Sequence, residues 1–117
     1  MAHSIALEKS TLFAKRIVKL YQCLTKERGE YILSKQILRS GTSIGANITE
    51  AMYGSSRKDF LAKLQIAKKE AAETQYWLEL LHSGEYLSDQ EYQSVSKECK
   101  AILAILVSIV KTASENA

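Results

Sequence analysis

The segment GTSIG, Gly41–Gly45, matches the pattern G-x-S-x-G. In serine hydrolases this pattern places a nucleophilic serine on a sharp turn between a strand and a helix. The residues before Ser43 show helical rather than strand periodicity, and only His3 and His82 could serve as a general base. Because no sheet and no oxyanion-hole loop accompany the pattern, it favours packing over catalysis at Ser43. We predict no catalytic residue and no enzymatic activity.

Carboxylates flank two apolar stripes, with Arg39 and Glu50 beside one stripe and Glu70 and Glu73 beside the next. Di-iron helical bundles combine such carboxylates with a Glu-x-x-His motif on two helices, and this sequence has no such motif. We therefore expect no metal and no cofactor. The carboxylates are expected to form ion pairs with Arg39 or with a lysine of another helix, within the bundle or between subunits.

The composition is that of one soluble globular domain over residues 1–117, with 46% hydrophobic and 25% charged residues. The chain contains no proline and five glycines, which favours long helices and short connections. No secretory signal is recognised, and the longest apolar run, Ala101–Val110, is about half the length of a membrane span. Cys23 and Cys99 have no metal-ligand spacing and are expected to be reduced thiols in a cytoplasmic protein.

Apolar residues recur at alternating steps of three and four in four segments. We expect helices over about residues 7–26, 31–53, 57–83 and 89–114. Gly29 and Gly84 are placed to end helices, and Ser56 and Ser88 are placed to cap them, with Ser88 opening a capping box. Connections this short require consecutive helices to run antiparallel. The predicted fold class is all-α, an up-down-up-down antiparallel four-helix bundle.

Gly41 and Gly45 fall inside the second expected helix, on or beside its apolar stripe. Each glycine costs about 1 kcal/mol relative to alanine in a helix interior, so close approach of another helix is the expected compensation. A helix break at Gly41, with Thr42 or Ser43 as a new N-cap, is the competing interpretation. Both interpretations stay open from the sequence.

The fourth expected helix is apolar on more than one face, because Leu103, Ile105, Val107 and Val110 add to its heptad stripe. A wide core stripe would explain these residues. A second face buried between subunits would explain them equally well.

Charge is distributed unevenly along the chain, although the net charge is only +3. Residues 1–40 carry eight Lys/Arg and three Asp/Glu, and residues 41–69 carry five and two. Residues 70–117 carry three and eight, so the two ends of the chain have opposite charge. This distribution suits an anionic partner or association between unlike faces.

The basic residues of the first helix are the predicted nucleic-acid contacts, together with a basic pair before the third helix. This candidate set comprises Lys15, Arg16, Lys19, Lys26, Arg57 and Lys58. A solvated helix face is the plain alternative. Few aromatic residues are interleaved with these cations, so recognition of single strands by base stacking is weakly supported.

The segments QILRSGTSIGANITE (36–50) and DFLAKLQIAKKEAAETQYWLELL (59–81) resemble the four-helix-bundle family of 23S rRNA intervening-sequence proteins. Ala51 departs from the glycine usual in that family, and the first connection lacks the customary proline. The matching positions of the first segment are Gln36, Arg39, Ser43, Ile44, Asn47, Ile48 and Glu50. Those of the second are Phe60, Leu64, Ile66, Ala67, Glu73 and Leu78.

The resemblance implies a bacterial homo-oligomer, often a pentamer, with no established enzymatic activity. It also implies kinship with the accessory proteins of diversity-generating retroelements, which bind nucleic acid and partner a reverse transcriptase. The motif residues are then interface or packing residues, namely Arg39, Gly41, Ser43, Gly45, Asn47, Glu50 and Glu73.

Three hypotheses of function follow. The leading one is a non-enzymatic oligomeric bundle that binds RNA or DNA, or associates with a ribonucleoprotein, through its basic face, with a reverse transcriptase or a ribosomal component as a further partner and no membrane. The alternative is a protein-interaction scaffold without a nucleic-acid role. A small hydrolase using Ser43 is the most distant.

Overall fold

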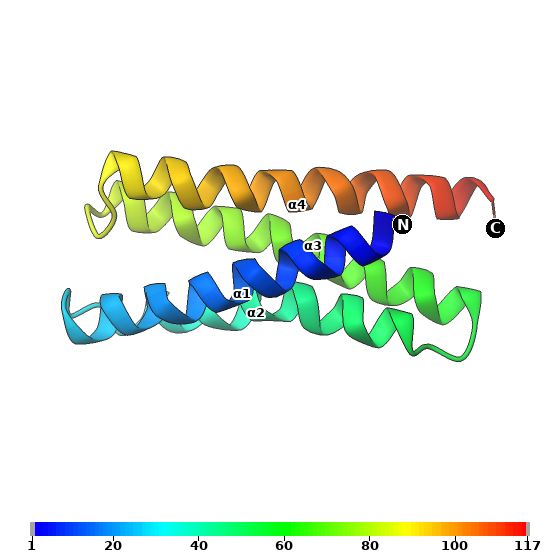
Figure 1. Ribbon diagram of the computed structural model, residues 1–117. Helices are drawn as coiled ribbons and strands as arrows, with labels where there is room; N and C mark the ends of the chain where they lie inside the picture. The colour runs from blue at the N-terminus through cyan, green and yellow to red at the C-terminus, as the bar shows by residue number, and fades with distance from the viewer. Residues whose placement is uncertain (1, 117) are drawn as a thin grey trace.

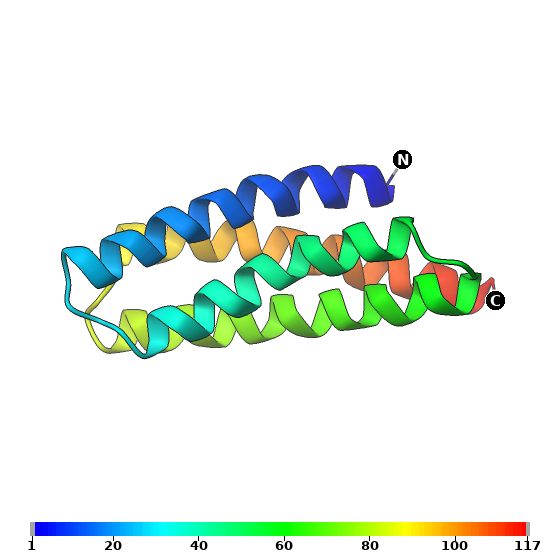
Figure 2. The ribbon, with the colours of Figure 1, turned by 90° about the horizontal axis from the view of Figure 1, so that it is seen from below.

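The computed structural model describes residues 2–116, and these form four α-helices and no strand (Figure 1). The helices are α1 (Ala2–Lys26), α2 (Leu33–Met52), α3 (Arg57–Ser83) and α4 (Asp89–Glu115). Successive helices run antiparallel, and they form an elongated bundle of 46 × 21 × 19 Å. Seen from below, α2 lies in front with α1 and α3 on either side (Figure 2). The predicted all-α four-helix bundle is confirmed.

The second helix begins later than predicted, at Leu33 rather than Tyr31. The carboxylate of Glu30, which is 7% exposed, supplies the cap that no side chain at Ile32 provides. The backbone N–H groups of Ile32, Leu33 and Ser34 donate to it at 3.2, 3.1 and 2.7 Å. A carboxylate at this position also interacts favourably with the positive end of the helix dipole.

Two of the predicted N-caps are present. The Ser56 side chain accepts a hydrogen bond from the backbone N–H of Asp59 at 3.1 Å. Ser88 and Glu91 form the full reciprocal capping box that opens α4. These caps use only residues three apart in sequence, which is why the pattern alone could locate them.

The turn after α1 and the turn after α3 each contain one residue in the left-handed region. Gly29 has φ 67°, a conformation that costs a glycine little. The corresponding residue after α3 is Glu85, with φ 66°, and not Gly84, whose φ is −81°. Gly84 does follow the last residue of α3, as expected, but a residue with a β-carbon carries the strained conformation.

One hydrophobic core runs the length of the bundle and draws on all four helices. It is built from the predicted heptad stripes. The largest fully buried apolar side chains are Phe13, Ile17, Leu24, Ile37, Ile44, Ile48, Leu64, Leu78, Leu81, Ile102 and Leu106.

Gly41 and Gly45 lie within one unbroken helix, α2. The helix α1 packs closely against both glycines, which compensates for their low helix propensity. A β-carbon at Gly41 would lie 3.0 Å from two side-chain carbons of Ile17, whereas one at Gly45 would lie 3.5 Å from Ser10. The neighbouring helix is therefore α1 of the same chain. The competing interpretation, a helix break at Gly41, is wrong, since α2 continues to Met52.

The extra apolar residues of α4 divide between core and surface. Val110 is buried, and Leu103 and Ile105 are half-buried against the core. Val107 remains 47% exposed. A wide core stripe thus accounts for three of the four residues, and Val107 has no apolar cover within the described chain.

Both cysteines are free thiols. Cys99 is buried, which raises the pKa of its thiol to about 12, and its Sγ lies 3.4 Å from the carbonyl oxygen of Ala71. Cys23 is half-buried, and a hydrogen bond with Glu27 raises the pKa of its thiol above the usual value. Neither thiol is set up as a nucleophile. None of the four described helices is long and apolar enough to cross a membrane.

Candidate functional site

Ser43 lies within α2, and its hydroxyl is committed to the helix. Its Oγ donates to the carbonyl oxygen of Arg39 at 2.6 Å. Both histidines lie near the ends of helices: His82 bonds Asp89 at 2.6 Å and stacks on Tyr92, and His3 packs edge-on against a ring of α3. Among the described residues Ser43 has no base at hydrogen-bond distance, so the arrangement is not that of an activated nucleophile.

The polar residues around Arg39 join α2 to α3. The guanidinium of Arg39 forms ion pairs with Glu70, at 3.1 Å, and with Glu73. Glu73 also accepts a hydrogen bond from Nε1 of Trp77 at 2.7 Å. Arg39 is thus held by two carboxylates, one of which also orients the indole, as the sequence-based expectation of ion pairing anticipated.

The other members of the α2 motif make local contacts. Asn47 donates from Nδ2 to the carbonyl oxygen of Ser43 at 2.8 Å. Glu50 pairs with Lys63 of α3 at 3.1 Å. No group of three or more potential metal ligands occurs within residues 2–116. The motif therefore ties α2 to α3 and provides no described metal-binding cluster.

The six predicted nucleic-acid contacts do not form one surface. Lys15, Lys19 and Lys26, hereafter the α1 lysines, are exposed along the outside of α1. Arg16 instead reaches α4, where its guanidinium bonds Glu98 and Ser94, each at 2.7 Å.

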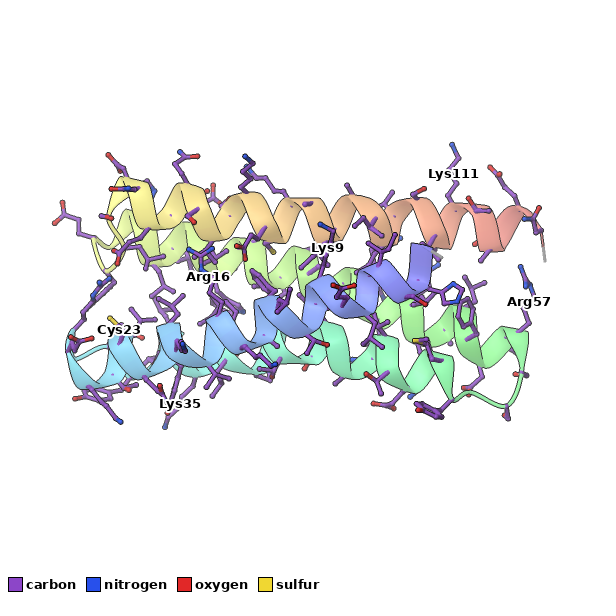
Figure 3. All side chains as sticks on the ribbon, in the orientation of Figure 1. Lys9, Arg16, Cys23, Lys35, Arg57 and Lys111 are labelled. Atoms are coloured by element: carbon purple, nitrogen blue, oxygen red, sulfur yellow. The ribbon has the colours of Figure 1, made fainter. Side chains whose placement is uncertain are left out.

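The remaining two predicted contacts, Arg57 and Lys58, begin α3. They lie at the far end of the bundle from the end of α1, as the positions of Arg57 and Cys23 show (Figure 3). Arg57 and Lys58 are therefore at the opposite end of the 46 Å bundle from Lys26, whereas Lys15 lies near the middle of α1.

An ion pair between Arg28 and Glu91, which was not predicted from the sequence, lies at the end of the bundle opposite Arg57. It joins the connection between α1 and α2 to the start of α4. The guanidinium of Arg28 donates to both carboxylate oxygens of Glu91, at 2.7 and 3.0 Å, and to the carbonyl oxygen of Tyr86 at 2.6 Å. The bond from Arg28, together with the backbone N–H of Ser88, lowers the pKa of Glu91 to about 2. This bidentate pair fixes the first connection against the start of α4.

The boundary between α1 and α4 is an open furrow, the least closely packed of the four helix boundaries. One hollow in it is lined by Lys9, Leu12, Glu98, Ala101 and Ile102. The exposed fractions of Leu12 and of Ile5 are 61% and 47%. We call this boundary the α1/α4 furrow. The helix α1 exposes apolar side chains on this side and buries its main apolar stripe in the core.

Known proteins are similar to this chain in sequence and in fold. The family model described as 23S rRNA-intervening sequence protein matches residues 3–108. The chain belongs to this family. The resemblance found in the two sequence segments is thereby confirmed.

A crystal structure from Bacteroides thetaiotaomicron VPI-5482, of a protein of unknown function from the S23 ribosomal protein family, is 52% identical in sequence. The similarity covers 95% of this chain and 99% of that one, with a TM-score of 0.93. None of the curated proteins matches the chain. The family descriptions refer to ribosomal RNA and to a ribosomal family, and neither names an enzymatic activity.

Proposed function

We propose that this member of the family is a non-enzymatic helical bundle that binds nucleic acid electrostatically. The supporting observation is that most arginines form ion pairs within the bundle whereas nearly all lysines do not. Three of the four arginines, Arg16, Arg28 and Arg39, are held by carboxylates of the bundle. Among the twelve lysines of the described chain, only Lys63 lies within ion-pair distance of a carboxylate.

Unpaired lysines suit contact with a phosphate backbone. An ammonium group is a compact charge on a flexible stem and contacts phosphates without regard to sequence. Arginine forks, which give geometric specificity, are mostly occupied inside the bundle. The expected binding is therefore non-specific and sensitive to salt, because each neutralised phosphate releases counterions.

A fluorescence-anisotropy titration of a labelled RNA duplex and a DNA duplex of equal length tests the proposal. At low salt both should bind, and the logarithm of the association constant should fall linearly with the logarithm of the salt concentration, by roughly 0.9 per phosphate contacted. No binding at low salt would refute the proposal. Affinity that does not change with salt would refute it as well.

The second candidate function is a self-associating scaffold, and the α1/α4 furrow favours it. Leu12 lines the furrow and is exposed, and the exposed Ile5 lies two turns before Leu12 on the same face of α1. Covering them with another copy of the chain would remove apolar surface from water, at about 25 cal/mol per Å². The exposed apolar residues support the proposal of a homo-oligomer, and the proposal of a pentamer rests on the resemblance. A reverse transcriptase or ribosomal component as a further partner rests on the resemblance.

Size-exclusion chromatography with light scattering tests self-association. The wild type should be oligomeric at micromolar concentration, and Leu12→Glu should shift it toward the monomer. Tyr53→Glu is the matched control, because Tyr53 is 87% exposed and lies after α2, which contributes no residue to the lining of the furrow. A monomeric wild type, or equal effects of both substitutions, would contradict an interface at the furrow.

A further inference from the structure

The outer side of α3 and α4 carries more cations than carboxylates. Four carboxylates occur between Lys58 and Leu78 of α3 and between Tyr92 and Lys111 of α4. These are Asp59, Glu70, Glu73 and Glu98. The same spans contain lysines at 58, 63, 68, 69, 97, 100 and 111, of which only Lys63 forms an ion pair within the described chain.

Each of the four carboxylates is turned away from the outer side. Glu70 and Glu73 reach Arg39 of α2, and Glu98 reaches Arg16 of α1. Asp59 lies against the connection between α2 and α3, where its Oδ2 is 2.9 Å from the position of a β-carbon at Gly54. The further carboxylates of this half of the chain are at 79, 85, 89, 91 and 115. Two of them are exposed on the helices themselves, Glu79 on α3 and Glu115 on α4, and Glu115 lies one turn after Lys111 on the same face.

Four of these seven lysines form two rows, one on each helix. Lys58 and Lys69 are eleven residues apart on α3, and Lys100 and Lys111 are eleven apart on α4. Eleven residues make about three turns, so the members of each row share a helix face and stand roughly 16 Å apart. All four side chains are exposed, and Lys111 points away from the bundle (Figure 3).

The register of α3 against α4 brings the rows level with each other. Cys99 contacts Ala71, and Gln75 contacts Ser96, which pairs residues whose numbers sum to about 170. Lys69 is therefore nearly level with Lys100, and Lys58 with Lys111. We call these four residues the lysine face. Val107, 47% exposed, lies one turn before Lys111 on α4.

We infer that the lysine face, and not α1, is the surface on which a nucleic-acid duplex docks. This inference rests on the proposed function and assigns it a surface. The rows run about 16 Å, the length of roughly five base pairs, and a duplex presents one phosphate per about 1.7 Å of axis. About half of those phosphates face the protein on one side, which matches four or more lysines.

The α1 lysines are a poorer match for the same backbone. Glu8 lies two turns before Lys15 on the same face, and Glu27 follows Lys26 directly. Neither of these two carboxylates forms an ion pair within the described chain, so each reduces the positive potential of its neighbouring lysine over about a Debye length. Beside the lysine face, by contrast, Glu70 and Glu98 are held by Arg39 and Arg16. Arg16, the arginine of α1, is already held by Glu98.

Two triple variants with equal charge separate the surfaces. Lys69→Gln/Lys100→Gln/Lys111→Gln alters the lysine face, and Lys15→Gln/Lys19→Gln/Lys26→Gln alters α1. Each changes the net charge from +3 to zero. All six side chains are exposed, so the variants should fold, and circular dichroism with thermal melting checks that they do.

Anisotropy titrations with a 24-base-pair RNA duplex, between 25 and 200 mM KCl, provide the measurement. The lysine-face variant should lose about 2.7 from the salt slope, roughly 0.9 for each lost contact, with a fall in affinity of about tenfold or more at 100 mM. The α1 variant should stay within about threefold of the wild type, because its lysines make few of the contacts.

The remaining outcomes are distinguishable. Equal losses in both variants would show that binding follows net charge alone and would overturn the assigned face while keeping the proposed function. A larger loss in the α1 variant, or no loss in either, would also overturn it. A wild type that does not bind the duplex would refute the proposed function itself. Preferential binding to anionic phospholipid vesicles would overturn nucleic acid as the partner.

Discussion

The two glycines of α2 should respond in opposite directions to alanine. A β-carbon at Gly45 would make ordinary contact with Ser10 at 3.5 Å. One at Gly41 would stand only 3.0 Å from Cγ1 and Cγ2 of Ile17, a fully buried side chain with little room to move. Gly45→Ala should therefore stabilise the bundle, and Gly41→Ala should destabilise it.

The magnitudes follow from two opposing effects. Alanine gains about 1 kcal/mol over glycine in a helix interior, and this gain applies to both positions. Overpacking a filled core costs about 1–3 kcal/mol, and this cost applies only at Gly41. We expect Gly45→Ala to raise the free energy of unfolding by about 0.5–1 kcal/mol. Gly41→Ala should lower it by about 1 kcal/mol.

Urea denaturation followed by Trp77 fluorescence and by circular dichroism measures both changes. A double-mutant cycle with Ile17→Ala isolates the contact, although Ile17→Ala alone costs about 2–5 kcal/mol. In that background the obstructing carbons are gone, so Gly41→Ala should become stabilising. If Gly41→Ala is equally destabilising with and without Ile17, the close approach of α1 does not explain the glycine.

Three further predictions concern the connections. Glu91 has its pKa lowered to about 2 from 4.5 by Arg28, so its contribution to stability is present above pH 4.5 and is lost as the pH falls toward 2. Because the Arg28–Glu91 pair is part-exposed, Glu91→Gln should lower the free energy of unfolding by only about 1 kcal/mol at pH 7. The substitution should also reduce the loss of stability at acid pH, and an unchanged loss would contradict the role of this pair. Glu85→Gly should raise the melting temperature by relieving about 1 kcal/mol of left-handed strain, and a lowered melting temperature would argue against that strain. Glu30→Ala should cost about 1–2 kcal/mol and speed amide exchange at the start of α2, whereas unchanged exchange there would show that Glu30 is not the cap.

The fold was predictable because its signals are local. Heptad spacing, the caps at Ser56 and Ser88 and the turn at Gly29 involve residues a few positions apart, so each can be recognised from a short stretch of chain. The cap at Glu30 also had a local signal, an acidic residue at a helix start. The sequence pattern placed the helix start at Tyr31, whereas the N-cap residue is Ile32 and Glu30 caps the helix from two residues before it, a position that the usual capping patterns do not include.

The candidate site was predictable only in part, because pairing of charges is not local. Arg16 and Glu98 are 82 residues apart, and Arg28 and Glu91 are 63 apart. Sequence alone counted Arg16 among the free cations of the first helix. In the folded chain the guanidinium of Arg16 instead forms an ion pair with Glu98 of α4. Lys69, Lys100 and Lys111 have no carboxylate partner in the described chain.

Four helices and their antiparallel order follow from the sequence alone, because periodicity and capping act within one helix and short connections make consecutive helices antiparallel. The family follows from the motif residues of segments 36–50 and 59–81. Only the tertiary structure decided that Gly41 meets Ile17 of the same chain and that α3 and α4 turn their carboxylates inward toward Arg39 and Arg16. Those outcomes depend on which helix faces are brought within a few ångströms of each other, and that proximity arises when the bundle packs.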